Sequence, residues 1–258
     1  MAAPAIVALG DSITLGVGDG IQASGGDVGW AAHTARALGA TMFLNLAANG
    51  TRAGQLAHSQ LPLALAARPD VVLVTAGGND VLRGDFDAVR VELDLRETLE
   101  QLSAPGRAVV TVTLDRIGLF DLLPRAVAAV MARRVAAANG AIRGAAVATG
   151  TIVVDGALVF RQAGAAAWHI DRIHPSAAGH RAIAAAAVAQ LSSRWSPLGP
   201  IELPPPPPRT VDRAKWLIRN GAPWAARRSR DLIPQVAQAV THEMLEDRRA
   251  RLRGAVRA

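Results

Sequence analysis

Short apolar runs alternate with longer helical patterns over the first two hundred residues of the chain. The runs are rich in valine, leucine and isoleucine, and they lie at 5–9, 41–46, 71–75, 108–114 and 151–155. Runs of this length and composition predict strands that are covered on both faces. The segments between and after them predict helices, at 30–38, 54–67, 86–102, 124–148 and 177–191.

This alternation predicts an α/β fold in which βα units build a parallel sheet. Right-handed crossovers would place helices on both faces of the sheet and form a three-layer α/β/α sandwich. We expect five strands in the flavodoxin-like order 2-1-3-4-5. The loops after strands 1, 2 and 3 would then meet at one edge of the sheet, which is where such folds bind ligands.

The composition of the chain changes at five consecutive prolines, residues 204–208. Such a run forms a semi-rigid polyproline II spacer. We therefore expect a domain over 1–203, a linker over 204–208 and a helical C-terminal extension over 209–258. In the extension, a helical pattern runs from about 231 to 253.

The net charge of +7 comes entirely from the C-terminal part of the chain. Residues 1–203 contain 16 arginines and 16 acidic residues, whereas residues 204–258 contain 12 basic residues and 5 acidic ones. A basic amphipathic helix can bind an anionic membrane or nucleic acid. We favour the alternative that its apolar face, with Trp216, Leu217 and Trp224 nearby, packs on the core or on a second subunit.

The composition also excludes several classes of protein. There is no cysteine, which excludes disulfides and thiolate metal sites. Aromatic residues make up only 3% of the chain, which argues against base-stacking platforms and a nucleic-acid partner. No signal-peptide pattern and no apolar run of about 18 residues is present, so we expect a cytoplasmic location.

The stretch VALGDSITLGVG, residues 7–18, places Asp11 and Ser12 at the end of the first predicted strand. The glycines around them permit tight turns that leave backbone N–H groups free to bind a ligand. An Asp-Ser pair is also a common helix N-cap, which would be a purely structural role. The stretch is not G-x-S-x-G, so the usual α/β-hydrolase elbow is absent.

Two further polar loops follow the second and third predicted strands. NLAANGTRAG, residues 45–54, contains Gly50, and TAGGNDVL, residues 75–82, contains Asn79. The backbone N–H of Gly50 and the side-chain amide of Asn79 can donate hydrogen bonds to a developing negative charge. Ordinary turns and helix caps would explain both loops equally well.

The stretch WHIDRIHPSAAGH, residues 168–180, places Asp171 three residues before His174. An acid at this spacing can hold one imidazole nitrogen and leave the other facing the edge of the sheet. A polar surface histidine is the structural alternative. The remaining histidines have no acid at a suitable spacing, and we expect structural roles for them, at 33, 58, 169, 180 and 242.

Taken together, the four stretches resemble the SGNH, or GDSL-type, hydrolase family, and they follow the order of its blocks between residue 6 and about 190. The residues that carry the resemblance are Gly10, Asp11 and Ser12 for the first block, Gly50 for the second, Gly77, Asn79 and Asp80 for the third, and Asp171, His174 and Pro175 for the fifth. The resemblance covers residues 1–203 as a catalytic domain and does not extend to the C-terminal extension.

The resemblance implies a serine esterase or lipase. Ser12 would be the nucleophile, His174 the general base, and Asp171 the group that orients the imidazole. The Ser12 and Gly50 N–H groups and the Asn79 side chain would form the oxyanion hole. The implied substrates are carboxylic esters: small acyl esters, lipid esters or O-acetylated sugars. No metal and no other cofactor is implied.

Two other functions remain open at this stage. An acyltransferase would use the same residues with an alcohol in place of water, and a non-catalytic binding protein would use the basic extension. Trp30 and Trp168 could line the substrate pocket, although core packing would explain each of them as well. The sequence carries no signal for the oligomeric state.

Overall fold

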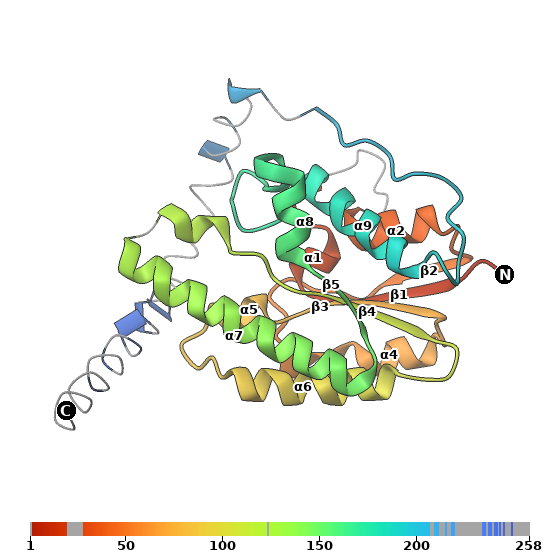
Figure 1. Ribbon diagram of the computed structural model, residues 1–258, viewed down its shortest axis with the longest axis horizontal. Helices are drawn as coiled ribbons and strands as arrows, with labels where there is room; N and C mark the ends of the chain where they lie inside the picture. The colour runs from red at the N-terminus through yellow and green to blue at the C-terminus, as the bar shows by residue number, and fades with distance from the viewer. Residues whose placement is uncertain are drawn as a thin grey trace.

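The computed structural model describes residues 2–19, 28–122, 124–206 and scattered residues between 209 and 249. A five-stranded sheet forms its centre, and every strand pair is parallel. The strands are β1 (Ala5–Gly10), β2 (Met42–Asn45), β3 (Val71–Thr75), β4 (Ala108–Val112) and β5 (Ile152–Val154). They lie in the order β2-β1-β3-β4-β5 (Figure 1), so the predicted fold class and strand order are confirmed.

Helices cover both faces of this sheet (Figure 1). One face carries α2 (Gly29–Ala37), α8 (Gly156–Ala163) and α9 (Ala177–Leu191). The other carries α3 (Leu56–Ser59), α4 (Leu61–Ala66), α6 (Ala88–Leu102) and α7 (Arg125–Thr149). The short helices α1 (Ser12–Leu15) and α5 (Gly78–Val81) follow β1 and β3 almost directly, and 3₁₀ segments lie at Ala53–Gln55, Gly118–Leu122 and Gly164–Ala167.

Two apolar clusters, one on each face of the sheet, form the core. Successive side chains of a strand point to opposite faces, so Ile6 and Ala8 join one cluster while Val7 and Leu9 join the other. All four are fully buried, and β3 and β4 are buried along their whole length. The edge strands β2 and β5 are only partly buried, as their position in the sheet requires.

The single helix predicted over residues 54–67 is wrong, because this segment divides into a 3₁₀ turn, α3 and α4. Gln60 lies at the break and is buried. Its side-chain amide donates to Gly10 O at 3.0 Å and its side-chain oxygen accepts from Gly10 N at 2.7 Å. Pro62, which has no N–H to continue a helix, follows at the start of α4. The break therefore supplies a side chain that pairs with the end of β1.

The apolar pattern did not predict α1, α5 or α8, although the sequence offered helix caps at 11–12 and in 75–82 as alternatives. The first two are only four residues long, which is too short for apolar periodicity to be detected. The N-cap of α8 is Asp155, whose side chain accepts a hydrogen bond from Leu158 N at 3.0 Å. An aspartate at the end of a predicted strand is a signal from which this helix start could have been predicted.

The C-terminal extension is described only in part. Every described residue between 234 and 249 is helical, and Val240 is buried. Trp216, Leu217 and Trp224 lie outside the described residues, as do prolines 207 and 208. The division of the chain at the prolines stays a prediction. Among the described residues, none of the helices combines the length and apolar character that crossing a bilayer requires.

The close contact between α9 and the preceding turn gives a first testable prediction. A Cβ at Gly179 would lie 2.3 Å from Ala167 O and 3.0 Å from Pro175 Cβ. Gly179→Ala should therefore destabilise the protein by roughly 1–3 kcal/mol through overpacking. Urea unfolding followed by circular dichroism measures this change.

Gly140→Ala is the matched control, because Gly140 is exposed on α7 and a Cβ there meets nothing within 4 Å. This substitution should stabilise the protein by about 0.5–1 kcal/mol, since alanine is the better helix former. Equal unfolding midpoints for the two variants would contradict the packing described for α9.

Candidate active site

Ser12, Gly50 and Asn79 lie just beyond the carboxyl ends of β1, β2 and β3, which are neighbours in the sheet. Backbone hydrogen bonds hold the three loops together: Asp11 N donates to Thr75 O at 3.2 Å, and Ala48 N donates to Gly10 O at 3.1 Å. The structure therefore brings the first three sequence stretches to one edge of the sheet.

The turn between β1 and α1 fixes the position of Ser12. Gly10 has a φ of +133°, and a Cβ there would lie 2.1 Å from Thr75 O, so only glycine allows this approach to β3. Asp11 is the N-cap of α1, and its Oδ1 accepts from Ile13 N at 2.9 Å and from Thr75 Oγ1 at 3.1 Å. Ser12 is the first residue of the helix, and its side chain is half-buried. The stretch therefore combines the structural role that the sequence offered, an N-cap at Asp11, with a serine whose side chain is only half-buried.

A small hairpin before α9 positions His174. Trp168 and Pro175 form an antiparallel bridge, and His169 N donates to His174 O at 3.0 Å. Inside the hairpin, Asp171 Oδ1 accepts from the backbone N–H groups of Ile173 at 2.9 Å and His174 at 3.0 Å. One carboxylate oxygen thus shapes the turn and leaves the other oxygen free to contact a side chain.

Ser12, His174 and Asp171 form a continuous chain of hydrogen bonds. Ser12 Oγ lies 2.9 Å from His174 Nε2, and His174 Nδ1 lies 2.8 Å from Asp171 Oδ2. A neutral imidazole that donates from Nδ1 to the carboxylate presents the lone pair of Nε2 to the serine hydroxyl. The geometry is therefore that of a nucleophile beside a general base whose orientation an acid fixes.

The environment of Asp171 keeps its carboxylate ionised. Burial acts to raise the pKa of Asp171, but hydrogen bonds from His169 and His174, the charge of His174 and the backbone N–H of His174 outweigh it. The pKa of Asp171 consequently lies well below its usual range, and the acid remains a hydrogen-bond acceptor at any ordinary pH.

The loops at this edge of the sheet carry the three hydrogen-bond donors that the sequence indicated: Ser12 N, Gly50 N and the Asn79 side chain. Among the described residues, no acceptor is bonded to the backbone N–H of Ser12 or of Gly50. Gly50 has a φ of +81°, and a Cβ there would meet no atom of the described residues within 4 Å. Asn79 Nδ2 donates to Thr51 O at 3.0 Å, which leaves its second hydrogen for another acceptor.

An ion pair joins the loops that carry Gly50 and Asn79. Asp80, which is buried, accepts from Arg52 Nε at 3.1 Å and from Ala53 N at 3.1 Å. Arg52 also contacts Asp85 at 3.0 Å. Asp80 therefore holds the segment after Gly50 in two ways, through the side chain of Arg52 and through the backbone N–H of Ala53.

The model of the GDSL-like lipase/acylhydrolase family matches residues 8–182, which include all of these loops. This chain belongs to that family. The resemblance seen in the sequence is thus confirmed, and the protein is an ester-hydrolysing enzyme of the GDSL type. A search of the curated proteins found no match.

Solved structures show the same fold. A variant of Axe2, an acetyl xylan esterase from Geobacillus stearothermophilus, has 22% identity and a TM-score of 0.60, over 74% of this chain and 95% of that one. LAE5, an alpha/beta hydrolase enzyme from the metagenome of Lake Arreo in Spain, has 24% identity and a TM-score of 0.54, over 73% of this chain and 94% of that one.

The two tryptophans considered for the substrate pocket of this GDSL-like enzyme differ in their surroundings. Trp30 is completely buried within a core cluster, so the structure does not place it in a substrate pocket. Trp168 is partly buried and packs on Phe160, with ring centroids 4.6 Å apart. Because it precedes His169 in the hairpin, Trp168 stays a candidate for the pocket wall.

The expectation that the other histidines lack a paired acid is wrong for His33 and His169. His33 Nε2 lies 2.6 Å from Asp19, which is 14 residues away in the sequence. His169 Nδ1 lies 3.2 Å from the same Asp171 oxygen that contacts His174. The spacing of 14 residues does not predict the pair of His33 and Asp19. His169 and Asp171 are two residues apart within the stretch that carries the family motif, so their pair could have been predicted.

His180 has the structural role that we expected. It is fully buried, and burial lowers its pKa to about 4, so the ring is neutral at pH 7. Its Nε2 donates to Val17 O at 2.9 Å, and its Nδ1 accepts from Trp30 N at 3.2 Å. The ring therefore ties α9 to the segment after α1. His242 lies outside the described residues.

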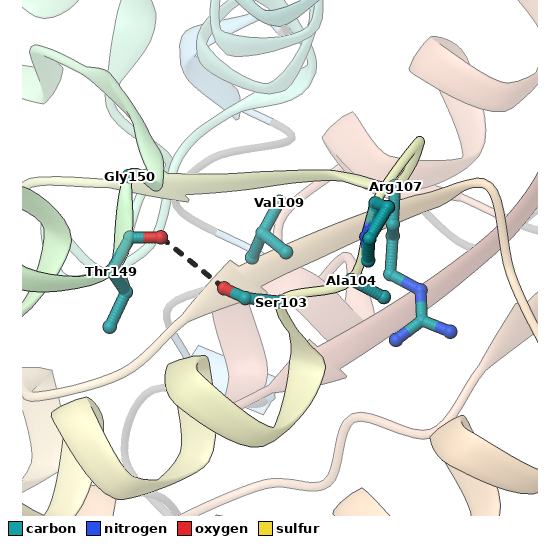
Figure 2. Close-up of a pocket in the computed structure, with 7 residues that line it drawn as sticks. Ser103, Ala104, Arg107, Val109, Thr149 and Gly150 are labelled. Carbon is teal, nitrogen blue, oxygen red and sulfur yellow. Dashed lines mark hydrogen bonds between the residues drawn. The ribbon is translucent and has the colours of Figure 1, made fainter.

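A hollow of about 330 Å³ lies at the opposite edge of the sheet (Figure 2), lined by Ser103, Arg107, Val109 and Thr149 among others. These residues come from the ends of α6 and α7 and from the amino end of β4. The hollow therefore faces away from Ser12. Within the described residues, no group of three or more histidine or acidic side chains could hold a metal ion.

The burial of Asp11 gives a pH-dependent prediction. Burial raises the pKa of Asp11 to about 6 from its ordinary 3.8, so Asp11 favours the folded state below about pH 4 and loses this contribution as the pH rises through 6. Asp11→Asn keeps an oxygen that can accept from Ile13 N and Thr75 Oγ1. Relative to wild type, it should gain roughly 2 kcal/mol between pH 4 and pH 7.5.

Urea unfolding of both proteins at the two pH values measures this gain. Asp87→Asn is the control, because Asp87 caps α6 by accepting from Val89 N at 2.9 Å but is exposed, and so carries no cost of burying a charge. A stability difference between Asp11→Asn and wild type that is the same at both pH values would contradict the assignment.

Proposed function

We propose that the enzyme hydrolyses esters of short acyl groups through a covalent acyl-enzyme on Ser12. The observation that carries this proposal is the unbroken chain from Ser12 Oγ through His174 to Asp171, with links of 2.9 and 2.8 Å. A serine hydroxyl is a weak nucleophile by itself, and a base held at this distance activates it.

In the first step, Ser12 Oγ attacks the ester carbonyl carbon while its proton passes to His174 Nε2. Asp171 stabilises the resulting imidazolium through the bond to Nδ1 and does not itself take the proton. The tetrahedral intermediate collapses when the carbon–oxygen bond to the leaving alcohol breaks, and His174 protonates that alcohol. The serine then carries the acyl group.

In the second step, water repeats the reaction on the acyl-enzyme. His174 takes a proton from the water molecule, whose oxygen attacks the acyl carbon, and then returns the proton to Ser12 Oγ as the acid leaves. The enzyme is restored, and one ester and one water have become an acid and an alcohol.

Three donors would stabilise the oxyanion of both intermediates: the N–H groups of Ser12 and Gly50 and the side-chain amide of Asn79. Among the described residues, neither backbone N–H has an acceptor, and this supports the role. The bond from Asn79 to Thr51 O also supports it, because this bond fixes the amide plane beside the Gly50 loop.

Acetyl esters of sugars are the substrates that we favour within this class. Axe2, whose fold this chain shares, is described as an acetyl xylan esterase, and its catalytic mutants replace a serine, an aspartate or a histidine. The clearance around a Cβ at Gly50, which meets no described atom within 4 Å, supports room for a bulky alcohol at this loop.

Loss of either reacting side chain should abolish turnover of p-nitrophenyl acetate. Ser12→Ala and His174→Ala should each lower kcat by roughly 10⁴-fold or more, since the members of such a chain act as a unit. The matched controls are Ser59→Ala and His58→Ala, which change exposed residues of α3 and should leave kcat unchanged. Turnover by Ser12→Ala at a tenth of the wild-type rate would rule out Ser12 as the nucleophile.

Asn79→Ala tests the oxyanion hole separately. Removal of one donor typically lowers kcat about 10²–10³-fold. The KM for p-nitrophenyl acetate should change much less, because the lost interaction strengthens only as charge develops. An increase in KM at unchanged kcat would instead place Asn79 in ground-state binding.

A further inference from the structure

The C-terminal extension lies against the part of the domain that follows α5. Gln238 is close to Gly84, since a Cβ at Gly84 would lie 3.0 Å from Gln238 Oε1. Val240, on the same helical segment, is only 7% exposed. The described residues between 234 and 240 therefore pack on the loop between α5 and α6.

Glu243 fixes this contact by charge. Its two carboxylate oxygens lie 3.1 Å from Arg134 Nε and 3.4 Å from Arg133 Nη2, both on α7. Arg134 is only 5% exposed, whereas Glu243 is 24% exposed. The extension thus brings a counter-ion to a buried guanidinium.

Arg134 in turn holds the end of α5. Its Nη1 donates to Val81 O at 2.9 Å, and its Nη2 donates to Arg83 O at 2.8 Å. Its guanidinium also lies over the ring of Phe86, 4.9 Å from the centroid. The last carbonyl groups of a helix have no partner within the helix, so Arg134 supplies one for Val81 O and also holds Arg83, two residues beyond the end of α5.

Helix α5 spans only Gly78–Val81, and Asn79 is its second residue. A four-residue helix has too few internal bonds to keep its own geometry, and the contacts at its ends therefore decide where Asn79 points. Within α5, Asp80, the residue after Asn79, is tied to Arg52 and to Ala53 N. At its end, Arg134 supplies the corresponding restraint (Figure 1 shows α5 beside α7).

We infer that Glu243 is a positioning residue of the active site. It neutralises Arg134, Arg134 holds α5, and α5 presents the Asn79 amide to the oxyanion. The inference rests on the proposed function of Asn79. The C-terminal extension would then contribute to the activity of the hydrolase domain and would not be a separate module.

The physical reason is the cost of a buried charge. Burial lowers the pKa of Arg134, and the charges of Glu243 and Asp85 oppose this effect. Asp85 is already paired with Arg52, so among the described residues Glu243 is the acid that contacts the guanidinium. Without Glu243, the guanidinium loses this counter-charge and is better solvated if it moves toward water, which would release the carbonyl groups of Val81 and Arg83.

Glu243→Gln in the full-length chain tests the inference, because it removes the charge and keeps the shape. We expect kcat for p-nitrophenyl acetate to fall about 3- to 10-fold with little change in KM. Glu202→Gln is the control: it removes the same charge from an exposed residue and should leave kcat unchanged. Glu243→Asp, which restores the charge, should recover most of the lost rate.

A double-mutant cycle with Asn79→Ala separates positioning from general stability. If Glu243 acts through Asn79, Glu243→Gln should lower kcat in the wild-type background and have no further effect in the Asn79→Ala background. An equal loss in both backgrounds, or no loss in the wild-type background, overturns the inference. If Asn79→Ala itself keeps full activity, the proposed oxyanion hole fails first, and the cycle shows which of the two ideas is wrong.

Discussion

The hydrogen bond between Ser12 Oγ and His174 Nε2 joins residues 162 positions apart in the sequence, and the proposed reaction depends on it. The bond can form only because a parallel sheet gathers the carboxyl ends of its strands at one edge. Ser12 leaves the end of β1 there, and the hairpin from Trp168 to Pro175 carries His174 to the same place. Because α2 and α9 pack on the same face of the sheet, the hairpin that precedes α9 lies near the carboxyl end of β1.

Three acids beside the reacting groups do different work because their surroundings differ. Asp171 accepts hydrogen bonds from the histidines and the backbone, which keeps it charged. Asp11, buried with few partners, has a raised pKa and serves as a helix cap. Asp80 pairs with Arg52 and fixes one loop to another. Only the first contacts the imidazole, and the other two hold the loops that carry Ser12, Gly50 and Asn79.

Much of this arrangement could be predicted from the sequence, since strands buried on both faces appear as short apolar runs. The predicted order of the strands then indicated which loops share an edge, and the spacing of Asp171 and His174 indicated their pairing. Contacts made by tertiary packing could not be predicted in this way, because no local pattern in the sequence indicates them. Some pairs depend on how elements pack rather than on local spacing. They are Gln60 with Gly10, Asp19 with His33, and Arg133 with Glu243, which is 110 residues away.

The central claim is that His174 makes the hydroxyl of Ser12 a nucleophile, and covalent labelling tests it most directly. A fluorophosphonate probe should phosphonylate the wild-type enzyme at a single site, which peptide mass spectrometry would assign to Ser12, and Asp171 and His174 should remain unmodified. The probe should react far more slowly with His174→Ala. An enzyme that hydrolyses esters but is labelled elsewhere, or not at all, would contradict the account.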